Sequence, residues 1–208
     1  MRISLSQIES ARKNPSKFAA TFGNGFRGRP YFRLYFDMAI KRFQEKKGTI
    51  DQTIEFFTAR CEDKLSHQTN YIGRLNRYRE TLRIYCDTCA NQGLDYFHWS
   101  LPVHINVGSH TITGTAKNLH LKVVDSGYSV IHTQTEDADW SSELKWPLIQ
   151  FAVAESMGAT SDEVDVRAFR MDTANFEVQA FSMEEIDEAL LESEKLINQV
   201  EGILSDVS

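Results

Sequence analysis

The chain has 208 residues, of which 41% are hydrophobic, with only 4 prolines and 11 glycines. This composition is typical of one compact soluble domain, and a chain of this length needs no disulfide framework or structural metal to fold. No apolar run approaches the roughly 20 residues of a membrane span, and the first residues lack the apolar core of a signal peptide. Three cysteines, an odd number, fit a reducing compartment better than a secreted protein. We therefore expect a single cytoplasmic domain over residues 1–208, with no membrane contact.

The net charge of −6 conceals an uneven distribution of charge along the chain. Residues 1–98 carry 17 Lys and Arg against 10 Asp and Glu, whereas residues 99–208 carry 6 against 19. Such an asymmetry suggests a surface for nucleic acid or an acidic partner in the first half. The overall acidity argues against tight non-specific DNA binding, and ordinary solvated charge is the alternative.

The first half of the chain has the periodicity of helices. Ser4 or Ser6 can cap a short helix that ends at Asn14-Pro15, and residues 21–30 are predicted to form a glycine-rich loop without a Walker signature. Apolar residues at helical spacing predict helices over 31–46, 51–65 and 69–90.

The helix predicted over 69–90 has an apolar stripe flanked by arginines. The stripe contains Leu75, Tyr78, Leu82, Tyr85 and Cys89, and the flanking arginines are Arg74, Arg77, Arg79 and Arg83. The simpler interpretation is a core-facing stripe whose edges are covered by arginine stems. The alternative is an arginine-lined surface for phosphates or an acidic partner.

The second half changes to an alternating pattern. Strands are predicted over 99–106, 110–115, 118–124 and 128–134, with a turn at 125–127. A helix over 145–157, a hairpin over 164–171 and 176–181, and an amphipathic helix after the capping box Ser182-x-x-Glu185 complete the chain. We expect a mixed α/β fold, with a helical part over 1–94 and a sheet-helix core over 95–208.

Four segments occur in an order that belongs to a known family. They are Leu5-Ser6-Gln7-Ile8 with Asn14-Pro15-Ser16-Lys17-Phe18, then Ile112–Leu119, Ser129–Thr135 and Pro147–Ala152. In this order they resemble the PD-(D/E)XK nuclease superfamily, specifically its RecB-like exonuclease branch. The resemblance implies a restriction-endonuclease-like core, a mostly antiparallel or mixed central sheet flanked by helices.

The residues that carry the family's chemistry are replaced in this chain. On the alignment Lys117 takes the position of the first acidic ligand, His132 that of the second, and Gln134 that of the catalytic lysine. Pro147 and Phe151 replace the glutamine and tyrosine of the following helix, and residues 31–46 hold no histidine. Since Mg²⁺ needs hard oxygen ligands and a lysine repels it, the resemblance implies a nuclease fold without catalysis, metal or cofactor.

Two groups of residues have the chemistry of a metal site, and each also has a simpler structural interpretation. His132 and His120 could bind a transition metal, and Cys86-x-x-Cys89 has the spacing of half a zinc site. Hydrogen-bonded structural histidines and buried thiols are the commoner outcome for such positions. Some nucleases of this branch hold an iron–sulfur cluster with four cysteines, and Cys61, Cys86 and Cys89 are too few.

The resemblance implies DNA repair, recombination or phage defence, with a helicase or an active nuclease as protein partner. We expect a catalytically inactive subunit that scaffolds such a complex or binds DNA. The residues expected to contact DNA are Arg27, Arg29, Arg33, Arg74 and Arg77, with Lys117 and Gln134 at the former active-site cleft.

Two alternatives remain open at this point. The first is a protein-interaction subunit whose acidic second half docks a basic partner without DNA contact. The second is an active metal-dependent nuclease with a rearranged site, its ligands drawn from Asp125, Glu136, Asp137 and Asp139, and with Lys122 near Asp125.

Overall fold

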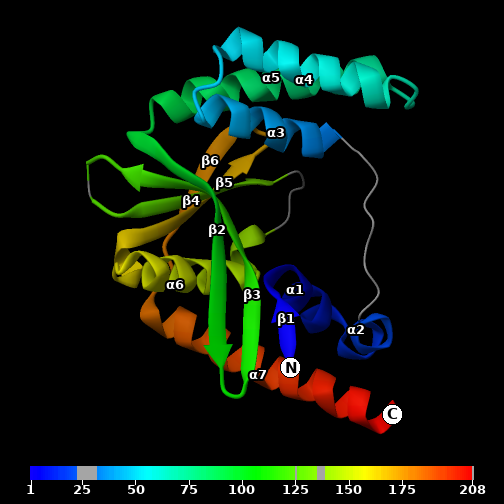
Figure 1. Cartoon of the computed structure of the whole chain (residues 1–208), viewed down its shortest axis with the longest axis vertical. Helices are drawn as coiled ribbons and strands as arrows, with labels where there is room; N and C mark the ends of the chain where they lie inside the picture. The colour runs from blue at the N-terminus through cyan, green and yellow to red at the C-terminus, as the bar shows by residue number, and fades with distance from the viewer. Residues whose placement is uncertain (23–31, 125, 135–138, 208) are drawn as a thin grey trace.

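The computed structural model describes residues 1–22, 32–124, 126–134 and 139–207. Within them the chain forms seven α-helices and a mixed sheet of six strands (Figure 1). The helices are α1 (Leu5–Lys13), α2 (Pro15–Thr21), α3 (Phe32–Gln44), α4 (Ile50–Leu65), α5 (Tyr71–Ala90), α6 (Lys145–Met157) and α7 (Met183–Val207). The strands are β1 (Arg2–Ser4), β2 (Leu94–Val107), β3 (His110–Lys122), β4 (Tyr128–Gln134), β5 (Val164–Arg170) and β6 (Asn175–Gln179). In this described part, no helix is long and apolar enough to cross a membrane.

The sheet is built around an antiparallel meander of β2, β3 and β4. Its order is β1-β3-β4-β5-β6, with β2 also paired to β3. β5 is parallel to β4, and such a pair needs a crossover, which α6 supplies. β6 is antiparallel to β5, and β1 is parallel to β3. The predicted mixed α/β class, with a sheet flanked by helices, is confirmed.

β3 and β4 are paired over only three positions, from Leu119↔Val130 to Leu121↔Tyr128. The turn between them depends on Gly127, which has a φ of 117°. A Cβ atom at Gly127 would lie 2.2 Å from the carbonyl oxygen of Glu163, so a larger residue does not fit there. Beyond the three pairs β4 continues beside β5 while β3 continues beside β2, and the two strands diverge.

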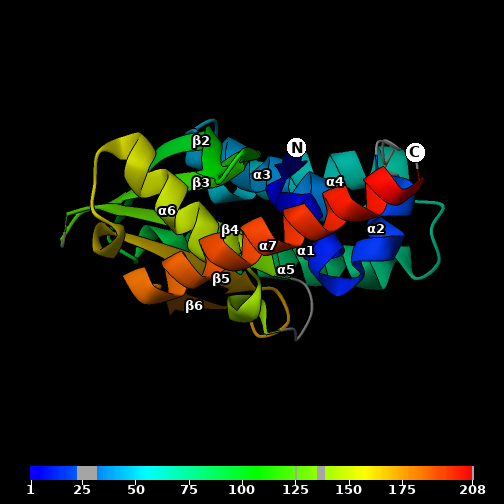
Figure 2. The same cartoon turned by 90° about the horizontal axis from the view of Figure 1, so that it is seen from below.

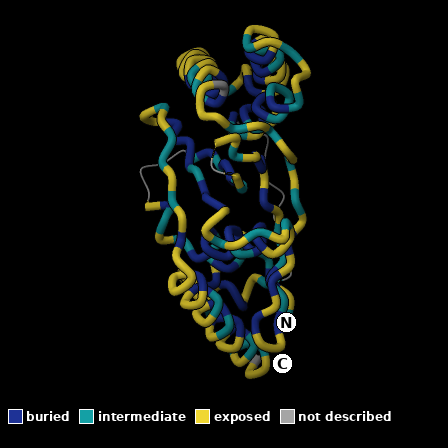
Figure 3. The backbone as a smooth tube through the Cα atoms, turned by 90° about the vertical axis from the view of Figure 1, so that its left-hand side faces the viewer, coloured by how far each residue is buried: buried dark blue, intermediate teal, exposed yellow. Residues whose placement is uncertain are grey.

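Two clusters of buried side chains lie on opposite faces of the sheet. The first contains residues of α1, α2, α6 and α7 with Val130 and Ala168, and the second contains residues of α3, α4 and α5 with Ile131 and Phe169. Neighbouring residues of one strand enter different clusters because successive side chains point to opposite faces. Figures 1 and 2 show α3–α5 together at one end of the molecule, with α6 and α7 on the other side of the sheet. Figure 3 shows the same layering: buried parts of the backbone lie toward the interior, and exposed parts lie on the outer sides of the helices.

The N-terminal segment differs from the sequence prediction. Arg2–Ser4 is a strand paired with β3, and the helix begins at Leu5, where the Ser4 N–H donates to Gln7 Oε1 at 2.9 Å. α1 ends at Lys13 as expected, but the chain enters α2 at once, because Pro15 tolerates the first helical turn and Asn14 Oδ1 accepts the Lys17 N–H at 2.9 Å. Residues 1–22 therefore pack with the first cluster rather than with the helices over 32–90.

The strands predicted over 99–124 are longer and fewer than expected. The segments 99–106, 110–115 and 118–124 form only two strands, β2 and β3. Asn118, inside β3, has a φ of 54°, a conformation that asparagine adopts more readily than most residues. This local break interrupts the alternation of β3, which is why the sequence pattern divides one strand into two.

Candidate functional site

A cavity of about 490 Å³ opens where β3 and β4 diverge. Its walls come from both strands, from α1 and α6 on one side, and from α3 on the other. Val130 and His132 of β4 line it together with Ile131 and Thr133, which point to the opposite face of the sheet. Side chains from both layers can meet here because, among the described residues, no strand lies between β3 and β4 at this level.

Three basic residues line the cavity, and they differ in how far they are already paired. Lys145 forms an ion pair with Glu143 at 2.5 Å, and its ammonium lies 4.5 Å from the ring centre of Trp146. Arg33 of α3 donates one hydrogen bond from Nη2 to the carbonyl oxygen of Thr133. Lys117 of β3 makes no hydrogen bond or ion pair with any residue that the structure describes. The ammonium group of Lys117 is therefore available to a bound anion.

Two acidic residues of the cavity were not predicted from the sequence. Asp37 of α3 accepts a hydrogen bond from Thr133 Oγ1 at 3.1 Å, and Glu9 of α1 lies in the opposite wall. Burial raises the pKa of Asp37, against the opposing effects of Arg33, the Thr133 hydrogen bond and Lys117. One signal for Asp37 existed, since Arg33 and Asp37 are four residues apart and so share one side of the helix.

His132, at the second acidic position of the alignment, is packed among aromatic rings. It is stacked on Trp146, with ring centres 3.8 Å apart, and its edge meets Trp140 at 4.9 Å. Trp140 is held in turn by a hydrogen bond from Nε1 to Glu177 at 2.7 Å. Neither ring nitrogen of His132 is exposed to solvent or makes a hydrogen bond of ordinary geometry.

The environment of His132 keeps its ring neutral. Burial lowers its pKa to about 3, with further lowering by the cations Lys145 and Arg33, and the main chain of Arg167 opposes the shift slightly. His120 is separate from it: burial and Arg167 lower the pKa of His120 to about 4, and its Nε2 shares a hydrogen bond with Asn118 at 3.0 Å. The two histidines do not form a pair.

The metal site of the resembling family does not fit the residues of this cavity. Lys117, which the resemblance aligns with one ligand position, is a cation, and the ring nitrogens of His132 are enclosed in the core. Among the described residues, no three His, Cys, Asp or Glu side chains are grouped so that they could hold a metal ion. The described residues of the cavity are therefore not a binding site for a divalent metal.

The remaining predicted residues lie in different places. Gln134 is outside the described lining of the cavity, and its carbonyl oxygen accepts the Met171 N–H at 2.9 Å. Asp139 also lies outside this lining, where it accepts a hydrogen bond from Ser141 at 2.7 Å. Lys122 lies 3.8 Å from Asp165. Arg27, Arg29, Asp125, Glu136 and Asp137 lie outside the described residues.

Arg74 and Arg77 are exposed on one flank of α5, outside the described lining of the cavity. The Arg74 guanidinium lies 4.6 Å from the ring centre of Phe32. Burial raises the pKa of Tyr78, and the charges of Arg74, Arg33 and Arg77 oppose this shift. By helical geometry Arg79 and Arg83 lie on the other flank, where Arg83 pairs with Asp51 at 2.8 Å.

The apolar stripe of α5 is confirmed as a core-facing surface. Leu75, Leu82, Tyr85 and Cys89 are buried in the second cluster, and Tyr78 packs against it. All three cysteines are buried and unpaired, and burial raises the pKa of Cys61 to about 12 and of Cys89 to about 11. These thiols are structural rather than metal-binding or reactive groups.

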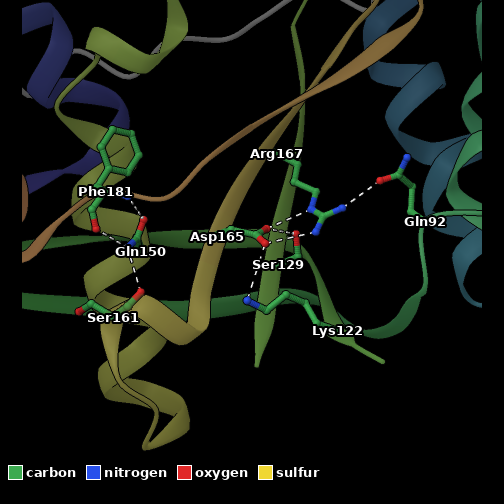
Figure 4. Close-up of polar contacts among 8 residues, drawn as sticks. All are labelled: Gln92, Lys122, Ser129, Gln150, Ser161, Asp165, Arg167 and Phe181. Carbon is green, nitrogen blue, oxygen red and sulfur yellow. Dashed lines mark hydrogen bonds and ion pairs between the residues drawn. The ribbon is translucent and has the colours of Figure 1, made fainter. Parts of the chain in front are cut away.

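A second polar cluster, on β5, is closed on itself (Figure 4). Asp165 accepts hydrogen bonds from Arg167 Nε at 3.0 Å and Nη2 at 3.2 Å, and another from Ser129. Arg167 also donates to Gln92 at 2.9 Å. Because the charges of this cluster satisfy one another, it ties β4, β5 and the end of α5 together and does not offer a binding site.

Comparison with known proteins supports the fold and is silent on the chemistry. No family model and no curated protein sequence matches the chain. Among solved structures, the crystal structure of a "putative exonuclease" from Eubacterium rectale is similar, with a TM-score of 0.64 and 9% identity over 99% of this chain and 82% of that one. The structure of SSO0001 has a TM-score of 0.36 and 12% identity, over 91% of this chain and 84% of that one. The first likeness shows a shared, nuclease-like fold.

Proposed function

We propose that this chain is a catalytically inactive, nuclease-like subunit that binds DNA, with a phosphate held in the cavity at the β3–β4 fork. The observation that carries the proposal is the ammonium of Lys117, which lines the cavity without a hydrogen bond or ion pair to any described residue. The resemblance to the nuclease family aligns Lys117 with an acidic metal ligand. A metal-dependent nuclease requires a negative group there, and a phosphate requires a positive one.

The electrostatics of the cavity favour an anion. Arg33, Lys117 and Lys145 are cationic, while burial raises the pKa of Asp37 and so disfavours its negative form. Arg33 uses one hydrogen-bond donor on Thr133, which leaves the other N–H groups of its guanidinium for a second partner. A guanidinium and an ammonium facing one space are a common arrangement for gripping phosphate oxygens.

The arginines of α5 extend this basic surface away from the cavity. Arg74 and Arg77 are exposed on one flank of α5, and their charges, like that of Arg33, act on Tyr78. A nucleic-acid backbone that places one phosphate at Lys117 can therefore meet further cations in the direction of α5. Such contacts fix position on the backbone without reading sequence.

The biological setting follows from the same reasoning. A nuclease fold that grips DNA without cutting it is useful beside an enzyme that supplies the chemistry, such as a helicase or an active nuclease. We therefore place the chain in a DNA-processing or defence complex in the cytoplasm, as its DNA-guiding part.

The proposal is tested by fluorescence anisotropy and gels with labelled single-stranded and duplex DNA, in EDTA, Mg²⁺ or Mn²⁺. We expect binding without cleavage, and a salt dependence whose slope falls by about 1 in Lys117→Gln, as one phosphate contact is lost. The double variant Arg74→Ala/Arg77→Ala should also weaken binding. The matched control is Arg79→Ala/Arg83→Ala, which removes the same charge from the other flank of α5.

Two outcomes would overturn the proposal. Metal-dependent cleavage that survives purification and disappears on substitution of Glu9 or Asp37 would show an active, rearranged site. Absence of any DNA binding at low salt would favour the second candidate, a protein-interaction subunit. The observation in favour of that candidate is the exposed acidic face of α7, formed by Glu184, Glu185, Asp187, Glu188 and Glu192.

A further inference from the structure

Trp99 of β2 is an aromatic wall of the cavity that the phosphate proposal does not use. It lines the cavity and is half-buried, packed on one side against the second cluster. Trp146 is stacked on His132 and Trp140 meets its edge, but no described aromatic ring stacks on Trp99. Trp99 therefore differs from the other two tryptophans in keeping its ring unstacked beside an open space.

Trp99 and Lys117 both line the cavity. Ser100, the residue after Trp99 in β2, is opposite Lys117 of β3, and neighbouring strands lie about 4.8 Å apart. Both residues therefore border one space that a small ligand can occupy. The backbone here is fixed by Asn118, whose side-chain amide donates to Tyr85 at 2.9 Å and whose oxygen meets His120 at 3.0 Å.

We infer that the cavity takes one unpaired nucleotide, with its base stacked on Trp99 and its phosphate on Lys117 and Arg33. This inference rests on the proposed function and names the ligand of the same site. The cavity volume of about 490 Å³ lies within the range of small-molecule sites, roughly 300–1,000 Å³. Every base offers a π-face, so recognition by stacking tolerates any sequence.

Base stacking distinguishes an unpaired nucleotide from duplex DNA. In a duplex the faces of the bases are covered by their neighbours, and only phosphates and groove edges are offered to a protein. The ligand can be a free nucleotide or an unpaired nucleotide in a strand, and both present the same base and phosphate to Trp99 and Lys117.

The experiment measures affinity for dAMP, inorganic phosphate, a short oligo-dA strand and a duplex of the same length. We expect Trp99→Leu to weaken binding of dAMP and the single strand by roughly 5- to 100-fold, the range of one lost base stack. Phosphate and duplex should be unaffected, and Trp99→Phe should retain most of the affinity. Phe97→Leu, at an exposed aromatic of the same strand outside the described lining, is the matched control.

Tryptophan fluorescence gives a second readout that needs no destabilising variant. Quenching by dAMP or oligo-dA should be present in the unchanged protein and absent in Trp99→Phe, although Trp140 and Trp146 remain. If dAMP binds as well as the strand, the ligand is a free nucleotide; a much tighter strand identifies nucleic acid. Both results support the inference.

Failure of the inference can be separated from failure of the proposed function. If single strands bind with dependence on Lys117 but Trp99→Leu and the fluorescence show no change, stacking is excluded and phosphate binding stands. If only duplex DNA binds, stacking of an unpaired base is excluded and DNA binding through phosphates stands. If no nucleic acid, nucleotide or phosphate binds, both fall together.

Discussion

Replacement of His132 by phenylalanine gives the sharpest test of how this site is built. Phenylalanine keeps a flat ring between Trp140 and Trp146 and removes two buried nitrogens that make no ordinary hydrogen bond. An unsatisfied buried polar group costs about 1–3 kcal/mol. We therefore expect His132→Phe to be at least as stable as the unchanged protein at pH 7.

The difference should grow as the pH falls. Native His132 has a pKa of about 3, against 6.5 for an ordinary histidine, so between these values the unfolded chain binds a proton that the native protein does not. At pH 5 the unfolded imidazole is protonated about 30-fold more often than not, which favours unfolding by about 2 kcal/mol relative to pH 7. The variant lacks this loss, so its advantage should increase by about 2 kcal/mol.

The assay is urea unfolding of both proteins at pH 7, 6 and 5, with the free energy of unfolding compared at each pH. His120, whose pKa of about 4 is also lowered, weakens both proteins at low pH and cancels in the difference. His104→Phe, which makes the same substitution on the exposed side of β2, is the control. Equal losses of stability from pH 7 to pH 5 in His132→Phe and the unchanged protein would refute the reasoning.

Three further predictions concern other buried groups. Because burial raises the pKa of Asp37, its native carboxyl favours folding at pH values below 3.8 and loses this contribution as pH rises through the raised value. Asp37→Asn should therefore have a higher free energy of unfolding in urea at pH 7, and it should bind DNA more tightly in the anisotropy assay. Weaker DNA binding by this variant would contradict the argument. Gln150 is fully buried; its amide nitrogen donates to the carbonyl oxygens of Ser161 at 2.9 Å and Phe181 at 2.8 Å, and its amide oxygen accepts the Phe181 N–H at 2.8 Å (Figure 4). Gln150→Leu should lower the free energy of unfolding in urea by about 2–4 kcal/mol, whereas the exposed substitution Gln199→Leu should not. The thiols of Cys61, Cys86 and Cys89 should not react with Ellman's reagent at pH 8 until urea unfolds the chain, since burial raises all three pKa values; rapid labelling of the native protein would contradict their burial.

The elements that the sequence predicts best are those with local signals at both ends. α6 spans Lys145–Met157 as predicted, because Pro147 suits a first turn and Gly158, with a φ of 64°, ends the helix. α7 begins directly after Ser182, where the predicted capping box forms: Glu185 accepts the Ser182 N–H at 2.7 Å. Amphipathic spacing placed α3, α4 and α5 within two residues of their bounds, because each buries one apolar stripe.

The elements that the sequence misses depend on distant partners. β1 is three residues long, too short for any periodicity, and it is a strand because β3 offers it hydrogen bonds more than a hundred residues later. The cavity is likewise a product of where two strands separate, which no local pattern records. Glu9 and Asp37 line the cavity from helices whose sequence pattern is dominated by an apolar stripe, and so their place in the cavity could not be predicted.

The two residues that the resemblance aligns with acidic ligands, His132 and Lys117, have different surroundings, and only Lys117 is proposed to bind a ligand. His132 is enclosed by Trp140 and Trp146, and a carboxylate there would bury an unpaired charge and leave space between the two tryptophans. His132 therefore contributes to the packing of the core. The side chain of Lys117 makes no hydrogen bond or ion pair with any described residue, and it lines the cavity together with Trp99. Since the divergence of β3 and β4 is maintained by their pairing with β2 and β5, it does not need either acid, and the space it creates is free to accept an anion at Lys117.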